Sequence, residues 1–247
     1  MENTAPSPVR RGISAAVLKW IAVVTMFIDH TGYALYGAWV HSGHRATYSL
    51  WVIYRVMRTI GRMAFPIYCF LLVEGYLHTR NVKKYALRLF LFGLISEIPF
   101  DMAFKRTWYA PGSQNVYFTL LLGLLAMWLW DLCTQKDFLR CAWWRKAAAA
   151  AAVAAMCLTA KWLRTDYRWT GVAVIFLLFL FRERHLLRFA AAGPTLLFSG
   201  MTEMWSWPMF LLFELYNGQR GRQSKYFFYV FYPAHLALLA VIARLIM

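Results

Sequence analysis

Long apolar runs recur through almost the whole chain and constrain its fold more than any other feature. Of the 247 residues, 61% are hydrophobic, whereas a soluble domain contains about 45–50% apolar residues. Inside a bilayer every backbone amide and carbonyl group needs a partner within the protein, and a helix supplies one for each. We therefore predict an all-α fold, a polytopic transmembrane helical bundle. No segment suits a separate soluble domain, so residues 14–247 are expected to form one transmembrane domain after a cytoplasmic tail of residues 1–13.

Nine apolar runs are candidate membrane spans. They cover residues 14–39, 52–77, 84–104, 115–132, 144–162, 169–182, 186–200, 203–216 and 226–246. The seventh and eighth are short and contain Gly193-Pro194 and Pro208, which disturb a helix. Either of these two segments can be tilted, broken or re-entrant.

The basic residues indicate how the chain is oriented. With the N-terminus in the cytoplasm, the nine-span arrangement puts 16 Lys and Arg residues in cytoplasmic segments and 7 on the opposite side. Cytoplasmic loops of membrane proteins carry such an excess, so the N-in orientation is favoured. Membrane orientation also explains the net charge of +16, and we expect membrane lipid, not nucleic acid, as the partner. The four cysteines form no CxxC pair and are expected to be structural thiols.

An acid and an imidazole, Asp29-His30, interrupt the first apolar run. A charged group at the bilayer centre costs from about 2.5 to more than 10 kcal/mol, so a chain that keeps such groups usually uses them. His30 lies roughly 15 residues into the run, which puts it in the outer half of the membrane. A neutral imidazole is well matched to proton transfer near pH 7. His30 is therefore the first candidate for chemistry.

Further polar residues are expected at a similar depth. Arg58 and Arg62 share one face of their helix, Glu97 and Asp101 lie near the outer end of the third run, and His235 lies near the middle of the last run. We expect four side chains to meet in one buried cavity at middle to outer depth: His30, Arg62, Glu97 and His235. The alternative is a set of interhelical pairs, such as Arg62 with Glu97, that only fixes the packing.

Helix geometry suggests which of these groups pair. Neighbouring helix residues point about 100° apart, so Asp29 is not an obvious partner for His30. Glu97 is the expected orienting carboxylate, and Asp29 is expected to pair with an arginine of residues 52–77. In the last run Pro233 has no N–H, so the carbonyl group of Tyr229 is left free to bind another partner.

A second polar set lies toward the cytoplasm, in the segments around residues 74–84 and 220–225. These residues form either a basic mouth for a phosphorylated donor or ordinary positively charged cytoplasmic loops. The sequence contains no Gly-rich phosphate loop and no CxxC, HExxH or GxSxG motif. This argues against a P-loop pump, a zinc protease and an α/β-hydrolase, and no metal site is expected.

Five segments, in order along the chain, carry a family resemblance. They are LKWIAVVTMFIDHTG (Leu18–Gly32), the segment Arg58–Phe104, NVYFTLLLGLL (Asn115–Leu125), TDYRWTGVAVI (Thr165–Ile175) and KYFFYVFYPAHL (Lys225–Leu236). Together they resemble the TraX-type membrane proteins, named for a conjugative-pilin N-acetylase. The chain departs from the pattern at Arg168-Trp169, where a smaller residue is expected, and in its alanine run Ala147–Ala152.

The resemblance implies a multi-spanning acyltransferase of the bacterial inner membrane that uses acetyl-CoA as acyl donor. The acceptor would be the amine or hydroxyl of a pilin-like peptide N-terminus or of a cell-envelope molecule. In this hypothesis His30 is the general base, and Arg62 or another donor stabilises the oxyanion. The full assignment is as follows: catalytic His30, Arg62, Glu97 and His235; acceptor-binding Asp29, Asp101, Asp166 and Tyr232; donor-binding Arg58, His78, Arg80, Lys84, Arg220 and Lys225.

A proton-coupled membrane transporter is the alternative function, because buried His and acidic residues also serve proton transport. Transporters of this kind often contain internal repeats with paired broken helices. The clear helix breaks here, Gly193-Pro194 and Pro208, have no counterpart early in the chain. The sequence therefore favours the acyltransferase.

Overall fold

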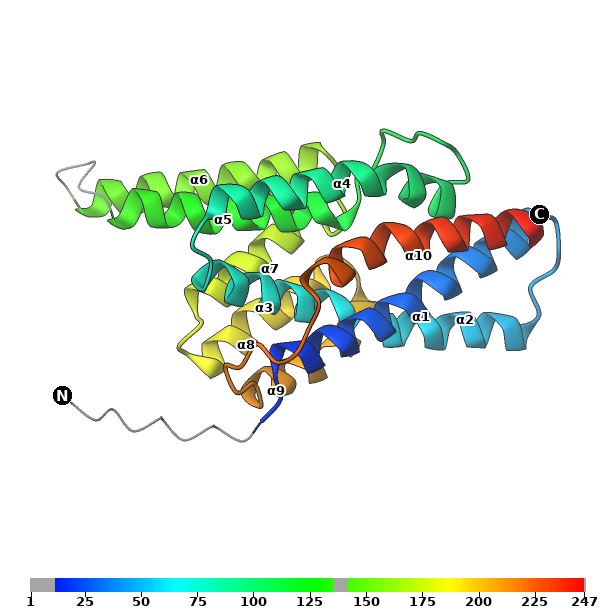
Figure 1. Cartoon of the computed structure of the whole chain (residues 1–247), viewed down its shortest axis with the longest axis horizontal. Helices are drawn as coiled ribbons and strands as arrows, with labels where there is room; N and C mark the ends of the chain where they lie inside the picture. Colours follow the sequence, from blue (N-terminus) through cyan, green and yellow to red (C-terminus); the bar gives the residue numbers. More distant parts are fainter. Residues whose placement is uncertain (1–11, 136–141, 247) are drawn as a thin grey trace.

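The structure, a computed structural model, describes residues 12–135 and 142–246 (Figure 1). These residues form ten α-helices and one 3-10 helix, η1. The helices are α1 (Ala15–His41), α2 (Tyr48–Gly61), α3 (Ala64–Leu77), α4 (Val82–Phe104), α5 (Val116–Gln135), α6 (Ala142–Trp162), α7 (Arg168–Leu180), α8 (His185–Leu197), η1 (Met201–Ser206), α9 (Pro208–Glu214) and α10 (Lys225–Ile246). Most of the predicted tail and Cys141 lie outside the described residues. Cys69, Cys133 and Cys157 are free thiols.

The all-α prediction is confirmed, and the chain is a multi-pass membrane protein by the length and apolar character of its helices. Four helical segments are long and apolar enough to cross a bilayer: Ala15–His41, Tyr48–Leu77, Val116–Thr134 and Tyr226–Ile246. The count of nine spans stays a prediction.

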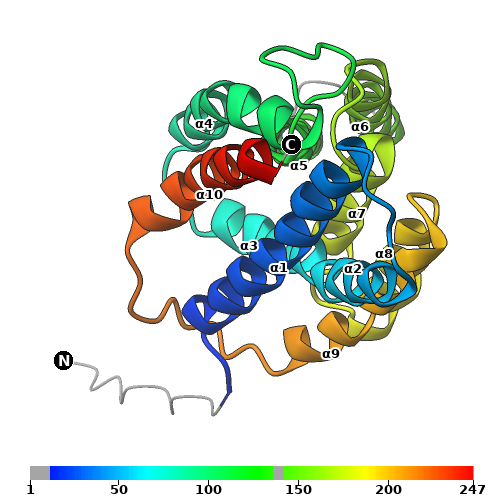
Figure 2. The ribbon, with the colours of Figure 1, turned by 90° about the vertical axis from the view of Figure 1, so that its right-hand side faces the viewer.

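Helix α3 forms the centre of the bundle. It is apolar on all sides, and 10 of its 14 residues are buried, as expected for a helix enclosed by others. Around it α1 packs on α2 and α10, α4 on α10 and α5, and α7 on α5, α6 and α8. Figure 2 shows α3 behind α1 and enclosed by the other helices.

A tight turn separates α2 from α3, where the sequence predicts one continuous helix over residues 52–77. The backbone N–H of Arg62 donates to Thr59 at 3.2 Å, and that of Met63 donates to Ile60 at 3.3 Å. Each of these bonds joins residues three apart, instead of four apart as in an α-helix, and this tightens the chain locally. Gly61, just before the turn, packs against Asp29 of α1 so closely that a Cβ atom would overlap that side chain. The turn therefore brings Arg62 directly to α1.

Helices α8, η1 and α9 form a hairpin. The 13 residues of α8 extend about 20 Å, less than the hydrocarbon thickness of about 30 Å. Arg188 near the start of α8 bonds to Glu214 at the end of α9, so the hairpin begins and ends at the same place. Glu203 at its tip bonds to Arg62 in the interior. Which of the three forms this region takes in the membrane stays a prediction.

The prolines of this hairpin act differently from expectation. Gly193-Pro194 lies inside α8 and does not interrupt it. Pro208 is the first residue of α9, a position where its missing N–H costs no helical hydrogen bond.

The bundle has two distinct ends. At one end, called here the N-terminal end, Ile13 pairs with Tyr216, and the N–H of Ala16 donates to Arg220. At the opposite end the connection between α4 and α5 pairs with that between α6 and α7 through Gln114 and Thr165. The N-in prediction assigns the N-terminal end to the cytoplasm.

Candidate functional site

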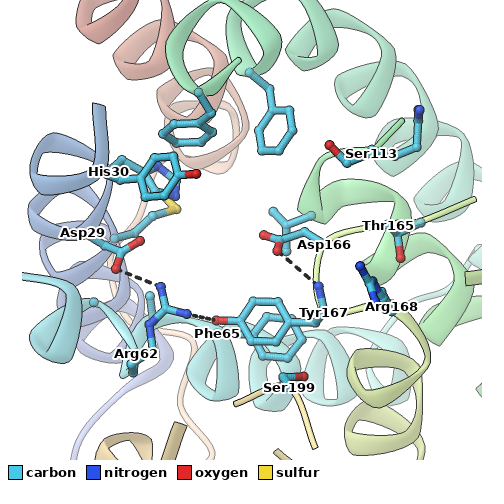
Figure 3. Close-up of a pocket in the computed structure, with 18 of the residues that line it drawn as sticks. Asp29, His30, Arg62, Phe65, Ser113, Thr165, Asp166, Tyr167, Arg168 and Ser199 are labelled. Carbon is cyan, nitrogen blue, oxygen red and sulfur yellow. Dashed lines mark hydrogen bonds and ion pairs between the residues drawn. The ribbon is translucent and has the colours of Figure 1, made fainter. Parts of the chain in front are cut away.

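A cavity of about 560 Å³ opens toward the opposite end of the bundle. We call it the His30 cavity. Asp29, His30 and Arg62 lie on one wall, and Ser113, Thr165 and Arg168 lie on the facing wall (Figure 3). The first wall is built by α1 and by the turn after α2. The facing wall is built by the connections before α5 and α7.

A chain of hydrogen bonds fixes the protonation of His30. Nδ1 of His30 lies 2.7 Å from Nε2 of His235, and Nδ1 of His235 lies 2.7 Å from the carbonyl oxygen of Phe231. A carbonyl group only accepts, so neutral His235 carries its proton on Nδ1 and accepts at Nε2. His30 must then donate from Nδ1. Its Nε2 is left unprotonated, with no hydrogen-bond partner among the described residues.

Aromatic rings hold the His30 imidazole in place. The ring centroid of His30 lies 5.1 Å from that of Phe104 and 5.9 Å from that of Tyr232, both in edge-to-face arrangements. Phe104 and Tyr232 also line the cavity. The imidazole is therefore oriented by one hydrogen bond and two ring contacts.

Asp29 closes an ion-pair network on the same wall. Its two carboxylate oxygens bond to Arg58 at 2.5 Å and to Arg62 at 2.8 Å. Arg62 also donates to Glu203 at 2.8 Å and to the Tyr167 hydroxyl at 3.3 Å. The expected pairing of Asp29 with arginines of residues 52–77 is confirmed.

The network changes the roles open to the two arginines. All three guanidinium nitrogens of Arg62 are engaged, because Nε donates to the carbonyl oxygen of Arg58 at 3.2 Å. Arg58 makes one hydrogen bond, to Asp29, and 27% of its side chain is exposed. Arg58 lines the His30 cavity, and its assignment to donor binding stays a prediction. It has more free donor capacity toward the cavity than Arg62.

Glu203 is the residue of this network that is not predicted from the sequence. It is 2% exposed and lies at the tip of the hairpin. A carboxylate at the start of an otherwise apolar run was the available signal.

Glu97 and Asp101 lie outside the His30 cavity. Glu97 accepts from Asn115, from the backbone N–H at 3.1 Å and from the side-chain amide at 2.8 Å. Asp101 accepts from the backbone N–H of Ala110 at 2.6 Å. The expected pairing of Glu97 with His30 or Arg62 is wrong, because both carboxylates face the connection between α4 and α5 and hold it in place.

Asp166 does reach the cavity. It lies in the short connection between α6 and α7, outside the helices, and accepts from the backbone N–H of Tyr167 at 3.1 Å. It lines the cavity, where the surrounding protein disfavours the charged form and raises the pKa of its carboxyl group, while Arg62 opposes the shift. Tyr167 itself stacks on Phe65 with ring centroids 3.6 Å apart.

A second cavity, of about 630 Å³, lies at the N-terminal end. We call it the basic cavity, because four cationic side chains and one carboxylate line it: Lys19, Arg80, Arg88, Arg220 and Glu74. Of the predicted donor-binding residues, His78, Arg80 and Arg220 line this cavity. Lys84 does not line it, and the side chain of Lys225 lies outside the described part of the chain. Tyr68 lines both cavities.

The carbonyl group of Tyr229 in the last helix has the partner that was expected. The hydroxyl of Tyr117 donates to the carbonyl oxygen of Tyr229 at 3.2 Å. This is the carbonyl group that Pro233 leaves without its helical donor. The prediction that it binds another partner is confirmed.

Comparison with known proteins gives a consistent assignment. The family model of the TraX protein matches residues 14–243. A probable fimbrial assembly protein, FimC of serogroup H1, from Dichelobacter nodosus is 37% identical over 126 residues, which cover 46% of this chain and 45% of that protein. The match thus spans about half the length of that relative, and no solved structure matches significantly. Because this family model covers nearly the whole chain, the protein belongs to the TraX family.

Proposed function

We propose that this protein transfers an acetyl group from acetyl-CoA to an amine or hydroxyl acceptor, with His30 as general base. The observation that carries the proposal is the hydrogen-bond chain from Phe231 through His235 to His30, which leaves Nε2 of His30 as a free acceptor. A general base needs such a nitrogen within reach of the proton that it removes. The family and the fimbrial relative support a role related to pilin.

The reaction balances as an acyl transfer. The acceptor nitrogen or oxygen attacks the thioester carbon while His30 Nε2 takes the acceptor proton. The tetrahedral oxyanion collapses and breaks the C–S bond, and the CoA thiolate takes the proton back from His30. Arg58, with free donor capacity beside the cavity, is suited to stabilise the oxyanion. Arg62 supports it by holding Asp29.

The basic cavity is suited to the phosphates of coenzyme A. Lys19, Arg80 and Arg220 supply positive charge there, and the N-in orientation would open it to the cytoplasm. Tyr68 separates it from the His30 cavity, so the thin arm of the donor would pass this side chain to bring its thioester to His30. The acceptor would then enter from the outer side of the inner membrane.

The hairpin of α8, η1 and α9 is compatible with this orientation. Because its two ends lie together, the hairpin leaves the direction of α10 unchanged. The predicted N-in, C-out arrangement is therefore the same whether the hairpin is counted as two spans or as none.

Replacement of His30 tests the proposal. We expect His30→Gln to reduce acetyl transfer from labelled acetyl-CoA by about 10²–10⁴-fold, the usual contribution of a general base. His41→Gln, an exposed position in the last turn of α1, is the matched control and should keep full activity. Wild-type turnover in His30→Gln would refute the role of His30. Absence of acetyl-CoA binding to folded wild-type protein in calorimetry would refute the acyltransferase and favour the transporter.

A further inference from the structure

We infer that the wall of the His30 cavity that faces His30 binds an anionic group, a phosphate or carboxylate, of the acceptor. The inference deepens the proposed function and rests on it for the transfer step. Anion binding itself does not depend on that step.

Unpaired positive charge is the first observation. Lys105, Arg164 and Arg168 line the cavity, and their side chains form no hydrogen bond or ion pair with a residue that the structure describes. The arginines on the His30 wall differ, since Asp29 and Glu203 offset their charge. The facing wall therefore has positive charge available for a ligand.

Unpaired hydroxyl groups on the same wall are the second observation. Thr165 is 1% exposed, and its Oγ1 has no hydrogen-bond partner in the described structure; the same holds for the buried Oγ of Ser113. Both residues line the cavity, and Figure 3 shows them on the side of Arg168, across from His30. A buried hydroxyl without a partner destabilises a protein. An anion is an acceptor that both hydroxyls and both guanidinium groups can donate to.

The backbone of this wall is the third observation. Arg164, Tyr167 and Arg168 have φ angles of 52°, 60° and 46°, a left-handed conformation that is uncommon for residues other than glycine. Two hydrogen bonds with Gln114 hold the segment: its N–H donates to Arg164 at 3.2 Å, and its carbonyl oxygen accepts from Asp166 at 2.9 Å. Strained backbone that its surroundings enforce is typical of ligand sites.

This wall changes the expected acceptor. Asp101 and Asp166 are predicted to bind the acceptor, and two carboxylates would favour a cationic one. However, Asp101 is bonded to Ala110 away from the cavity, and the two lining carboxylates, Asp29 and Asp166, are outnumbered by basic side chains. An acceptor anchored by its anionic group on Arg164 and Arg168 would present its amine or hydroxyl to His30. The acceptor is therefore a molecule with both an anionic and a nucleophilic group.

A pair of model amines tests the inference. We expect O-phosphoethanolamine to be acetylated with a kcat/KM at least about tenfold above that of 2-methoxyethylamine, which lacks the anion, because charged hydrogen bonds contribute energies of this order. The Arg164→Gln/Arg168→Gln variant should abolish this preference and keep the KM for acetyl-CoA. Lys83→Gln/Arg184→Gln removes the same charge outside both cavities and should keep the preference. Transfer to phosphatidylethanolamine in mixed phosphatidylcholine vesicles, but not to the soluble ester, would identify a lipid headgroup as the source of the anion; the reverse would identify a soluble phosphate ester.

The outcomes separate the inference from the proposed function. Equal kcat/KM for the two amines in the wild type overturns the anion site and leaves the acyltransferase intact. If neither amine is acetylated, binding of inorganic phosphate tests the site without catalysis. In the Arg80→Gln/Arg220→Gln variant, which lacks the charges of the basic cavity, phosphate should raise the melting temperature of the protein. Adding Thr165→Val and Arg164→Gln to this variant should remove that rise. No rise in that background overturns the anion site without reference to catalysis.

Discussion

Tyr68 lines both cavities, but the two differ in how their charged side chains are paired. On the His30 wall, Asp29 and Glu203 fix Arg58 and Arg62 at stated distances, and His235 fixes His30. In the basic cavity, the cationic side chains of Arg80 and Arg220 have no fixed anionic partner among the described residues. Fixed pairs suit a reacting centre, where geometry decides the rate. Open charges suit the binding of a flexible phosphorylated group.

Of the substitutions that test this difference between the cavities, replacement of Asp29 should have the largest effect, a loss of stability. Asp29→Asn leaves two arginines without their shared carboxylate, and breaking a buried ion pair costs about 3–5 kcal/mol. We expect a clearly lower melting temperature in detergent. Glu183→Gln is the control, because its carboxylate is 83% exposed and an exposed pair contributes at most about 1 kcal/mol. A melting temperature of Asp29→Asn equal to that of the wild type would show that the network is not what stabilises this wall.

Replacement of His235 should have the next largest effect, on the rate alone. His235→Phe removes the acceptor for Nδ1 of His30, and we expect kcat to fall by about 10–100-fold, as for other partners that orient a histidine. The KM for acetyl-CoA should not change. His235→Gln should recover part of the rate, because its amide oxygen can accept the same hydrogen bond. Equal activity of the Phe and Gln variants would limit His235 to packing.

Substitutions in the basic cavity should have a smaller effect, and on the KM for acetyl-CoA instead of on kcat. We expect Arg80→Gln or Arg220→Gln to raise the KM for acetyl-CoA by about 3–10-fold with unchanged kcat, since each exposed charge contributes at most about 1 kcal/mol. The effect should shrink at high ionic strength, where such charges are screened. Lys83→Gln is the control, because Lys83 does not line the cavity, and it should leave KM unchanged. A fall in kcat for the Arg220 variant would contradict the division of labour between the cavities.

For residues on straight helices, the depth of each residue in the membrane, counted along its helix, is enough to predict which side chains lie close together. His30 and His235 were expected at similar depth and form a hydrogen bond. Asp29 pairs with arginines of the neighbouring helix as helix geometry suggested. Glu97 shows the limit of this reasoning, because depth does not fix the direction in which α4 turns its side chains. Its carboxylate faces Asn115 in the next connection.

The remaining site residues depend on irregular backbone that hydropathy does not encode. The turn at Arg62 interrupts a region that reads as one continuous apolar run, and the two short runs of residues 186–200 and 203–216 do not show that they fold into one hairpin. Glu203 reaches Arg62 only because the hairpin folds back inside the bundle. The wall formed by Arg164, Thr165 and Arg168 depends on backbone conformations set by its neighbours, so its residues could be noticed in the sequence only as a basic loop.

The bond between Glu203 and Arg62 also has a consequence for how the protein is made. Arg62 emerges from the ribosome 141 residues before Glu203, so the early helices enter the membrane with this arginine only partly neutralised by Asp29. The last third of the chain supplies the missing carboxylate from inside the bundle. Completion of the charge network therefore coincides with the arrival of the hairpin, and in nascent chains that end before it Arg62 would lack one of its two carboxylate partners.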